Sequence, residues 1–191
     1  MAGKVVMPAA VLAAALLAAG PAAALEICDD LWFTRNLLFH QAGQCFGSAL
    51  GQAVFGNEGC DASGVELGAA AKAMLAVIRA REAEWACSVD TSQTSLAVPE
   101  LELRMALEDL PVANGYESAC VGWKGARLEL RAGRRVGAAV TGVALAGDTL
   151  LFQFDDAGDW TFVELIRGGA AAGSGWARLA LGAESCEMMA G

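Results

Sequence analysis

Six cysteines constrain the fold of this 191-residue chain more strongly than any other feature. They show no C-x-x-C spacing, and the chain has a single histidine, so the common zinc-binding patterns do not fit. An even number of widely spaced cysteines is typical of disulfides, which persist in oxidising compartments. The sequence therefore predicts an exported, disulfide-bonded protein without a metal site.

The first 24 residues have the pattern of a secretory signal peptide. Lys4 is followed by an apolar run over residues 5–19 and by small residues over 21–24. We expect cleavage after Ala24. The alternative is an uncleaved membrane anchor, but the run is short against the roughly 20 apolar residues that a span needs. No second run of that length follows, so we expect no stable membrane insertion after cleavage.

The chain is acidic, with a formal net charge of −9 at neutral pH. Nucleic acids and anionic lipid surfaces attract basic proteins, so neither is expected as a partner. A surface dominated by one sign of charge instead favours a soluble, self-repelling exported protein.

The rest of the chain divides into two modules of different character. Residues 25–88 have helical periodicity, and residues 89–98 are polar and aperiodic, as in a linker. Beyond them apolar residues alternate with polar ones in short runs between Gly and Asp turns, for example in ELELRMAL, residues 100–107. We therefore expect an α+β protein, with a small helical module followed by a small β-barrel over residues 99–191.

The positions of the cysteines favour one pairing among the many that six allow. Two cysteines flank a predicted short helix over residues 48–55, two lie near the ends of the helical module, and two fall in the β module. The expected disulfides are Cys45–Cys60, Cys28–Cys87 and Cys120–Cys186.

A series of short motifs marks the β module between residues 128 and 179. A strand ending in Arg131 is followed by GVALAGD at residues 142–148, by WTFV beginning at Trp160, and by GWA around Trp176. This order resembles bacterial SH3 domains, small barrels found in many exported proteins, although alanine replaces the closing valine of that family. The resemblance implies an SH3-like barrel.

The helical module carries a second resemblance, over residues 28–60. Its CDDLWFTRN stretch and the LGQAVF of the next helix resemble the YARHG domain, and more closely a cysteine-containing branch of uncharacterised exported proteobacterial proteins. The Ala-Arg-His triplet of the family name corresponds here to His40, Gln41 and Ala42, so the single histidine is not aligned with the family's histidine. The resemblance implies a fold and an exported habitat but no reaction.

Four residues of the first predicted helix raise the question of a site. His40 has the pKa range of a general base, yet the sequence offers it no nucleophile or orienting partner, so we expect no catalytic role. Arg35 and Asn36 lie among apolar residues, where an arginine needs a partner. We interpret them as a structural clamp, the alternative being recognition of a ligand carboxylate. Gly43 ends the helix.

The β module offers a candidate ligand site around the turn DDAGD. Trp160 follows this turn, and Asp155 and Asp156 belong to it. Together with Trp176 they would form an acidic, aromatic rim suited to a cationic or amine-bearing ligand. The alternative is that both tryptophans belong to the core of the barrel.

These observations predict a non-catalytic binding protein of the cell envelope, periplasmic or secreted, without a cofactor. We expect the SH3-like barrel to contact peptidoglycan peptides or an envelope protein. Two alternatives remain open: a periplasmic enzyme of unknown class, which the lack of a nucleophile motif or phosphate loop disfavours, and a disulfide-stiffened structural or inhibitory protein. A pocket with convergent polar groups would favour the enzyme, and an exposed apolar patch the partner role.

Overall fold

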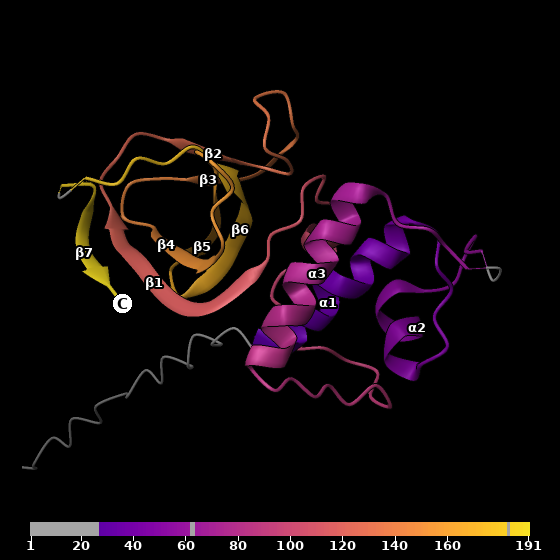
Figure 1. Cartoon of the computed structure of the whole chain (residues 1–191). Helices are drawn as coiled ribbons and strands as arrows, with labels where there is room; N and C mark the ends of the chain where they lie inside the picture. Colours follow the sequence, from indigo (N-terminus) through magenta and orange to yellow (C-terminus); the bar gives the residue numbers. More distant parts are fainter. Residues whose placement is uncertain (1–26, 62–63, 183) are drawn as a thin grey trace, which may run out of the picture.

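A computed structural model describes residues 27–61, 64–182 and 184–191. The predicted signal peptide, residues 1–24, lies outside the described residues. A group of helices from the first half of the chain lies beside a strongly curled sheet from the second half (Figure 1). The α+β class expected from the sequence is confirmed.

Three helices build the helical part. They are α1 (Ile27–Gln41), α2 (Ala49–Phe55) and α3 (Ala69–Glu84). Ser48 caps α2, because its hydroxyl accepts a hydrogen bond from the backbone N–H of Gly51. Gly43 follows α1 with a φ of 92°, the left-handed conformation expected of a residue that ends a helix. The third helix begins at residue 69 rather than 65, because Gly68 takes the extended conformation of a cap.

One element differs in kind from its prediction. The stretch ELELRMAL was expected to be a strand, but it contains the short helix α4 (Leu101–Met105). Its alternating pattern is incidental, since Arg104, one of the polar positions, is among the most buried residues of the chain. A strand would have turned that arginine to the solvent side.

Seven antiparallel strands form one sheet. They are β1 (Ala113–Trp123), β2 (Leu128–Arg131), β3 (Val140–Ala144), β4 (Thr149–Phe154), β5 (Thr161–Arg167), β6 (Ala170–Ala177) and β7 (Cys186–Ala190). Their order is β3-β2-β6-β5-β4-β1-β7, so β3 and β7 are the two edges. The sheet curls into a barrel-like shape (Figure 1), but no pairing of its two edges occurs among the described residues. A closed barrel is therefore not formed by these strands.

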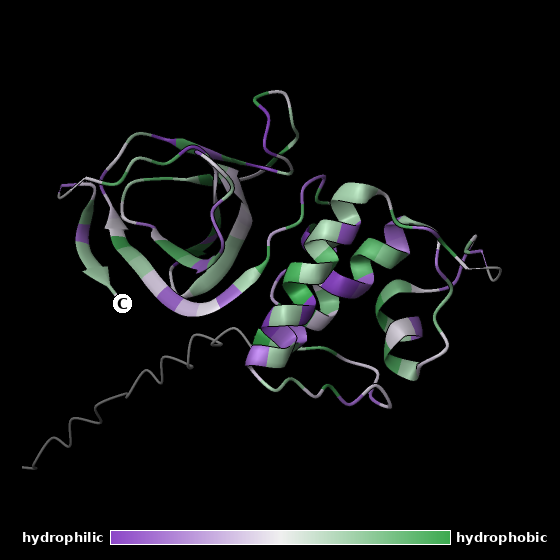
Figure 2. Ribbon diagram, in the orientation of Figure 1, coloured by the Kyte–Doolittle hydropathy of each residue, from purple (hydrophilic) through white to green (hydrophobic). Residues whose placement is uncertain are grey.

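The sheet separates two hydrophobic cores. Val163 and Leu165 of β5 lie in the inner core, which the curled sheet encloses. Phe162, on the opposite face of β5, belongs to a larger core that it shares with Leu31 and Phe33 of α1. Figure 2 shows the corresponding mixture of hydrophobic and hydrophilic residues along the helices and strands. Because one core contains residues of both modules, the helices and the sheet pack against each other.

The predicted linker, residues 89–98, has no helix or strand but is held against the helical part. The carbonyl of Thr91 accepts a hydrogen bond from the N–H of Leu50, and the Asp29 carboxylate accepts one from the N–H of Ala97. Val98 is buried in the shared core. These contacts fix the path between the modules.

Three disulfides join the same pairs that the sequence predicts. They are Cys28–Cys87, Cys45–Cys60 and Cys120–Cys186. The first connects the start of α1 to the end of α3, the second brackets α2, and the third connects β1 to β7. Among the described residues, no helix has the length and apolar character that crossing a bilayer requires.

Candidate functional site

The two tryptophans predicted for ligand binding lie in the shared core. Trp160 is 8 % exposed, and the indole N–H of Trp176 donates to the carbonyl of Asp109 at 2.7 Å. Arginines cover both rings: the guanidinium of Arg178 lies 5.1 Å from the centroid of Trp160, and that of Arg134 lies 5.3 Å from the centroid of Trp176. Other protein atoms therefore cover most of the surface of both tryptophan rings.

The two predicted aspartates have partners within the protein. Asp155 forms an ion pair with Arg81 of α3 at 3.2 Å, which ties the sheet to the helices. Asp156 accepts a hydrogen bond from the hydroxyl of Thr161 at 2.7 Å. A ligand site formed by these aspartates and the two tryptophans stays a prediction.

A cleft of about 350 Å³ lies beside Trp160, and we call it the basic cleft. Three arginines, three apolar side chains and one carboxylate line it: Arg127, Arg131, Arg178, Leu128, Val136, Trp160 and Glu129. Strand β2 and the residue after β6 meet here, because Arg131 pairs with Trp176 in the sheet. That pairing brings arginines from distant parts of the sequence to one place.

The carboxylates around the basic cleft balance part of its positive charge. Glu129 accepts hydrogen bonds from Arg127 at 3.0 Å and from Arg131 at 2.5 Å. Arg178 pairs with Asp159 at 3.1 Å. Three guanidinium groups thus face two carboxylates, and the side chains of Arg127 and Arg178 are exposed.

The chemistry of the basic cleft suits an anionic group. A guanidinium presents a planar fork of donors that matches a carboxylate. The exposed side chain of Val136 and the partly buried Leu128 offer apolar contact next to that fork. The charge is the reverse of the acidic rim expected near Trp160. Sequence reasoning missed it because Arg178 lies far along the chain from Arg127 and Arg131.

Arg35 and Asn36 both make contacts that stabilise the helices. The Nε–H of Arg35 donates to Glu82 of α3 at 2.8 Å, and this bond joins the first helix to the third. The side-chain amide of Asn36 donates to the carbonyl of Trp32, one turn earlier, at 2.7 Å. The structural clamp interpretation stays a prediction, and the partner of Arg35 lies on the third helix.

His40 lies at the end of α1 in a cluster of aromatic rings. Its ring is 5.3 Å from that of Phe55 and 6.4 Å from that of Phe46, and those two phenylalanines stack at 4.8 Å. The histidine therefore packs the first helix against α2 and the turn before it.

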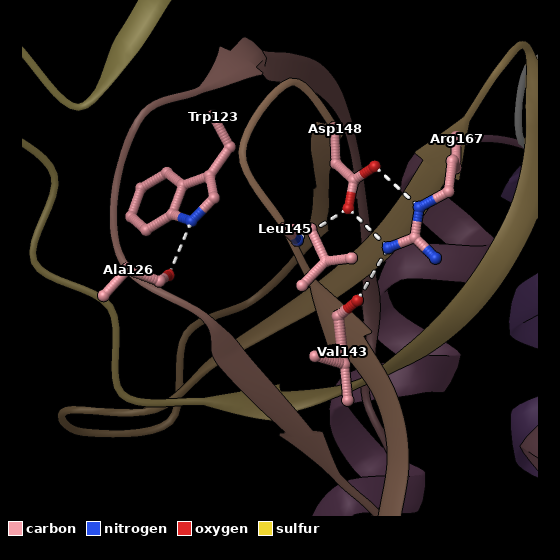
Figure 3. Close-up of polar contacts among 6 residues, drawn as sticks. All are labelled: Trp123, Ala126, Val143, Leu145, Asp148 and Arg167. Carbon is pink, nitrogen blue, oxygen red and sulfur yellow. Dashed lines mark hydrogen bonds and ion pairs between the residues drawn. The ribbon is translucent and has the colours of Figure 1, made fainter.

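Asp148 holds the turn of the GVALAGD motif. Its carboxylate accepts two hydrogen bonds from Arg167, at 2.9 and 2.6 Å, and one from the N–H of Leu145 at 2.7 Å (Figure 3). These bonds, first of all those from Arg167, lower the pKa of Asp148. In the same view the Trp123 indole donates to the carbonyl of Ala126 at 3.0 Å. The motif therefore forms a turn that ties the start of β4 to the end of β5.

A buried ion pair joins the two modules. Arg104 of α4 donates two hydrogen bonds to Asp30 of α1, at 2.7 and 3.2 Å, and the two side chains are 1 % and 0 % exposed. The guanidinium lies 5.6 Å from the ring of Phe33, 5.0 Å from Phe154 and 5.6 Å from Phe162. One arginine thus contacts a helix and two strands.

Glu164 is a buried ionisable group near this pair. It lies on the face of β5 that points to the shared core, because residues alternate between faces along a strand. Burial raises the pKa of its carboxyl to about 7; the charge of Arg104 opposes this rise, and Asp30, Glu100 and Glu117 add to it. Glu164 is therefore the described carboxyl most suited to titrate near neutral pH.

Replacing Glu164 by glutamine is expected to flatten the pH dependence of stability. The folded chain keeps this proton up to about pH 7, whereas the unfolded chain loses it near pH 4.5. The stabilisation is fully present below that lower value and is lost as the pH rises to about 7, a change of about 3 kcal/mol. Urea unfolding between about pH 5 and pH 8 measures the slope.

The variant should be more stable than the parent at about pH 8 and should show little slope over this range. Glu187→Gln, an exposed carboxylate on β7, is the matched control and should keep the slope of the parent. A parent-like slope in Glu164→Gln would assign the titration to another group.

The described ranges contain no group of three or more His, Cys, Asp or Glu residues placed to hold a metal ion. The expectation of a protein without metal or cofactor stays a prediction.

Comparison with known families gives two matches. Residues 86–191 match the family described as a domain of unknown function, DUF4453, and residues 4–83 match the YARHG domain. The second match supports the resemblance found in the helical module, whereas the first does not connect the sheet to SH3 domains. No curated protein and no solved structure matches the chain.

Proposed function

Since this chain belongs to the DUF4453 family, whose description assigns no function, we propose a function from its own geometry. It is a non-catalytic binding protein of an exported compartment, and it recognises carboxylate-bearing peptides at the basic cleft. The observation that carries the proposal is the gathering of three guanidinium groups in one cleft of an acidic protein.

The disulfides support our proposal for the compartment. Three disulfides are consistent with a periplasmic or extracellular location, because such bonds persist where thiols are not kept reduced. The signal-peptide pattern of residues 1–24 supports the same location. We place the protein in the periplasm or outside the cell.

The lining of the cleft supports our proposal for the class of ligand. A peptide with a free carboxylate would satisfy the exposed donors of Arg127 and Arg178, while its apolar atoms would lie against Val136 and Leu128. Peptidoglycan peptides carry such carboxylates in an exported compartment, and we propose them as the ligand. The alternative ligand is an envelope protein with an acidic segment, and the experiment below distinguishes it from peptidoglycan peptides.

We also infer that the curled sheet is an SH3-like barrel that remains open between its edges. The order of motifs from Arg131 to Trp176 supports this inference, as does the structural turn at Asp148. SH3-type domains bind extended peptides over a groove with aromatic residues. The basic cleft beside Trp160 would be the corresponding groove here.

The test is co-sedimentation of the purified, oxidised protein with isolated cell-wall sacculi. The parent protein should pellet, and binding should weaken as the salt concentration rises. Arg127→Gln and Arg178→Gln should each lower the apparent affinity about tenfold, because each removes a charge-assisted hydrogen bond. Both arginines are exposed, so neither change should prevent folding.

Arg135→Gln is the matched control, since Arg135 is an exposed arginine outside the lining of the cleft. It should pellet like the parent. Equal pelleting of all variants would contradict the cleft as the contact. A parent protein that stays in solution would contradict the wall as the ligand, and crosslinking in the periplasm would then search for a protein partner.

A further inference from the structure

The polar middle of β1 departs from regular pairing with β4. Ala113 pairs with Phe154, whereas Ser118 pairs with Phe152. The four residues between Ala113 and Ser118 therefore stand opposite Gln153 alone. Bulges of this kind occur next to binding sites, because they redirect side chains and open space in a sheet.

This bulge opens a cavity of about 170 Å³ where the helices meet the sheet. Residues from both modules line it: Ile27, Trp85, Gly115, Tyr116, Glu117 and Gln153. Figure 2 shows hydrophilic and near-neutral residues in this middle part of β1, with more hydrophobic residues on both sides of it. We call the space the junction cavity.

The backbone holds the junction cavity in shape. Gly115 has a φ of 81°, and a Cβ there would collide with the ring of Trp85, so the indole packs directly on glycine. Arg81 of α3 donates to the carbonyl of Asn114 at 2.8 Å, and the Asn114 side chain accepts from the N–H of Tyr116 at 2.8 Å. Contacts with α3 and a hydrogen bond within β1 therefore hold the bulge in place.

Two acceptors in the lining of the cavity, the amide oxygen of Gln153 and the carboxylate of Glu117, bear on the choice of ligand. The side chain of Gln153 is 5 % exposed, and its Oε1 atom has no hydrogen-bond partner within the described part of the chain. A buried carbonyl oxygen without a donor is costly, so a ligand that supplies one gains affinity. Glu117 adds a carboxylate to the lining, and its charge acts on the nearby Glu164.

We propose that the junction cavity binds the alkylammonium group of an amine about the size of a lysine side chain. An ammonium group supplies donors to Gln153 and a charge for Glu117, and the rings of Trp85 and Tyr116 attract cations. A cavity of roughly 150 Å³ accepts a molecule such as benzene, so this volume suits a four-carbon amine. The proposal does not depend on the basic cleft.

The test is NMR titration of the ¹⁵N-labelled, oxidised protein with n-butylammonium, with 1-butanol as the neutral probe of similar shape. Saturable shifts of the Trp85 indole and of the Gln153 side-chain amide are expected, with a dissociation constant on the order of 1–10 mM. Glu117→Gln, at an exposed position, should weaken binding about tenfold. Gln153→Leu should weaken it to a similar extent.

Two control variants test whether the amine binds at the junction cavity and not elsewhere on the protein. Glu187→Gln removes an exposed carboxylate elsewhere on the sheet, and Arg178→Gln alters the basic cleft; both should leave the titration unchanged. Equal binding of 1-butanol, or a lack of saturable shifts, would overturn the proposal.

A second titration distinguishes the two sources of such an amine. A lysine side chain of a peptide should bind as Nα-acetyl-lysine methylamide more tightly than 1,5-diaminopentane does. The reverse order would assign the site to free polyamines.

Discussion

Replacing Asp30 by asparagine is expected to lower the free energy of unfolding by about 3–5 kcal/mol. The change leaves the guanidinium of Arg104 buried without its counter-charge, among the rings of Phe33, Phe154 and Phe162. A buried guanidinium that loses the carboxylate bonded to it is costly, because the surrounding aromatic rings do not replace those hydrogen bonds. Urea unfolding at neutral pH, followed by tryptophan fluorescence, measures the loss.

A double replacement shows how much of this loss comes from the unpaired charge. Asp30→Leu with Arg104→Met removes both charges and keeps apolar volume, so most of the stability should return. Arg135→Gln breaks the exposed pair with Glu108 and should cost less than about 1 kcal/mol. A loss below about 1 kcal/mol in Asp30→Asn would contradict a desolvated ion pair at the junction.

Local signals in the sequence were sufficient for much of the secondary structure. Ser48 and Gly43 are residues whose chemistry marks helix ends, and both occur at helix ends in the structure. The runs TLLFQF and TFVEL form β4 and most of β5. Both combine β-branched and aromatic residues between turns, which is typical of strands. The cysteines were paired from their positions alone, since each pair brackets an element or a module.

The junction between the modules was not predictable in the same way. Arg104 follows Leu103 in a pattern that alternates like a strand, and sequence alone does not show that its partner Asp30 lies 74 positions earlier. In a sequence, a charged residue that is buried in the fold cannot be told from a surface residue until its partner is known. The helix α4 was therefore predicted wrongly, and the sequence left the contact between the modules open.

The candidate sites depend on long-range pairing for the same reason. The basic cleft exists because β2 lies next to β6, and the junction cavity exists because β1 bulges opposite Gln153. The segment ANGYESACVGW gave little strand signal, since its middle is polar and contains glycine. Its irregularity, which hid the strand, also forms the cavity.

Removing the disulfide between β1 and β7, by changing Cys120 and Cys186 to alanine, is expected to cost about 4 kcal/mol. The bond joins positions 66 residues apart, so it restricts the unfolded chain strongly in the chain-entropy model. It also secures an edge strand, because β7 pairs only with β1 among the described strands. We therefore expect the amides of β7 to lose protection first in hydrogen exchange.

The matched control is the corresponding double alanine variant of Cys45 and Cys60, which lie 15 residues apart. The shorter loop predicts a smaller loss of about 3 kcal/mol, and β7 should keep its protection. Urea unfolding of both variants, with hydrogen exchange at about neutral pH, compares the two effects. An unchanged unfolding midpoint in the Cys120 and Cys186 variant, with β7 still protected, would mean that the backbone ladder with β1 is enough to hold this edge of the sheet.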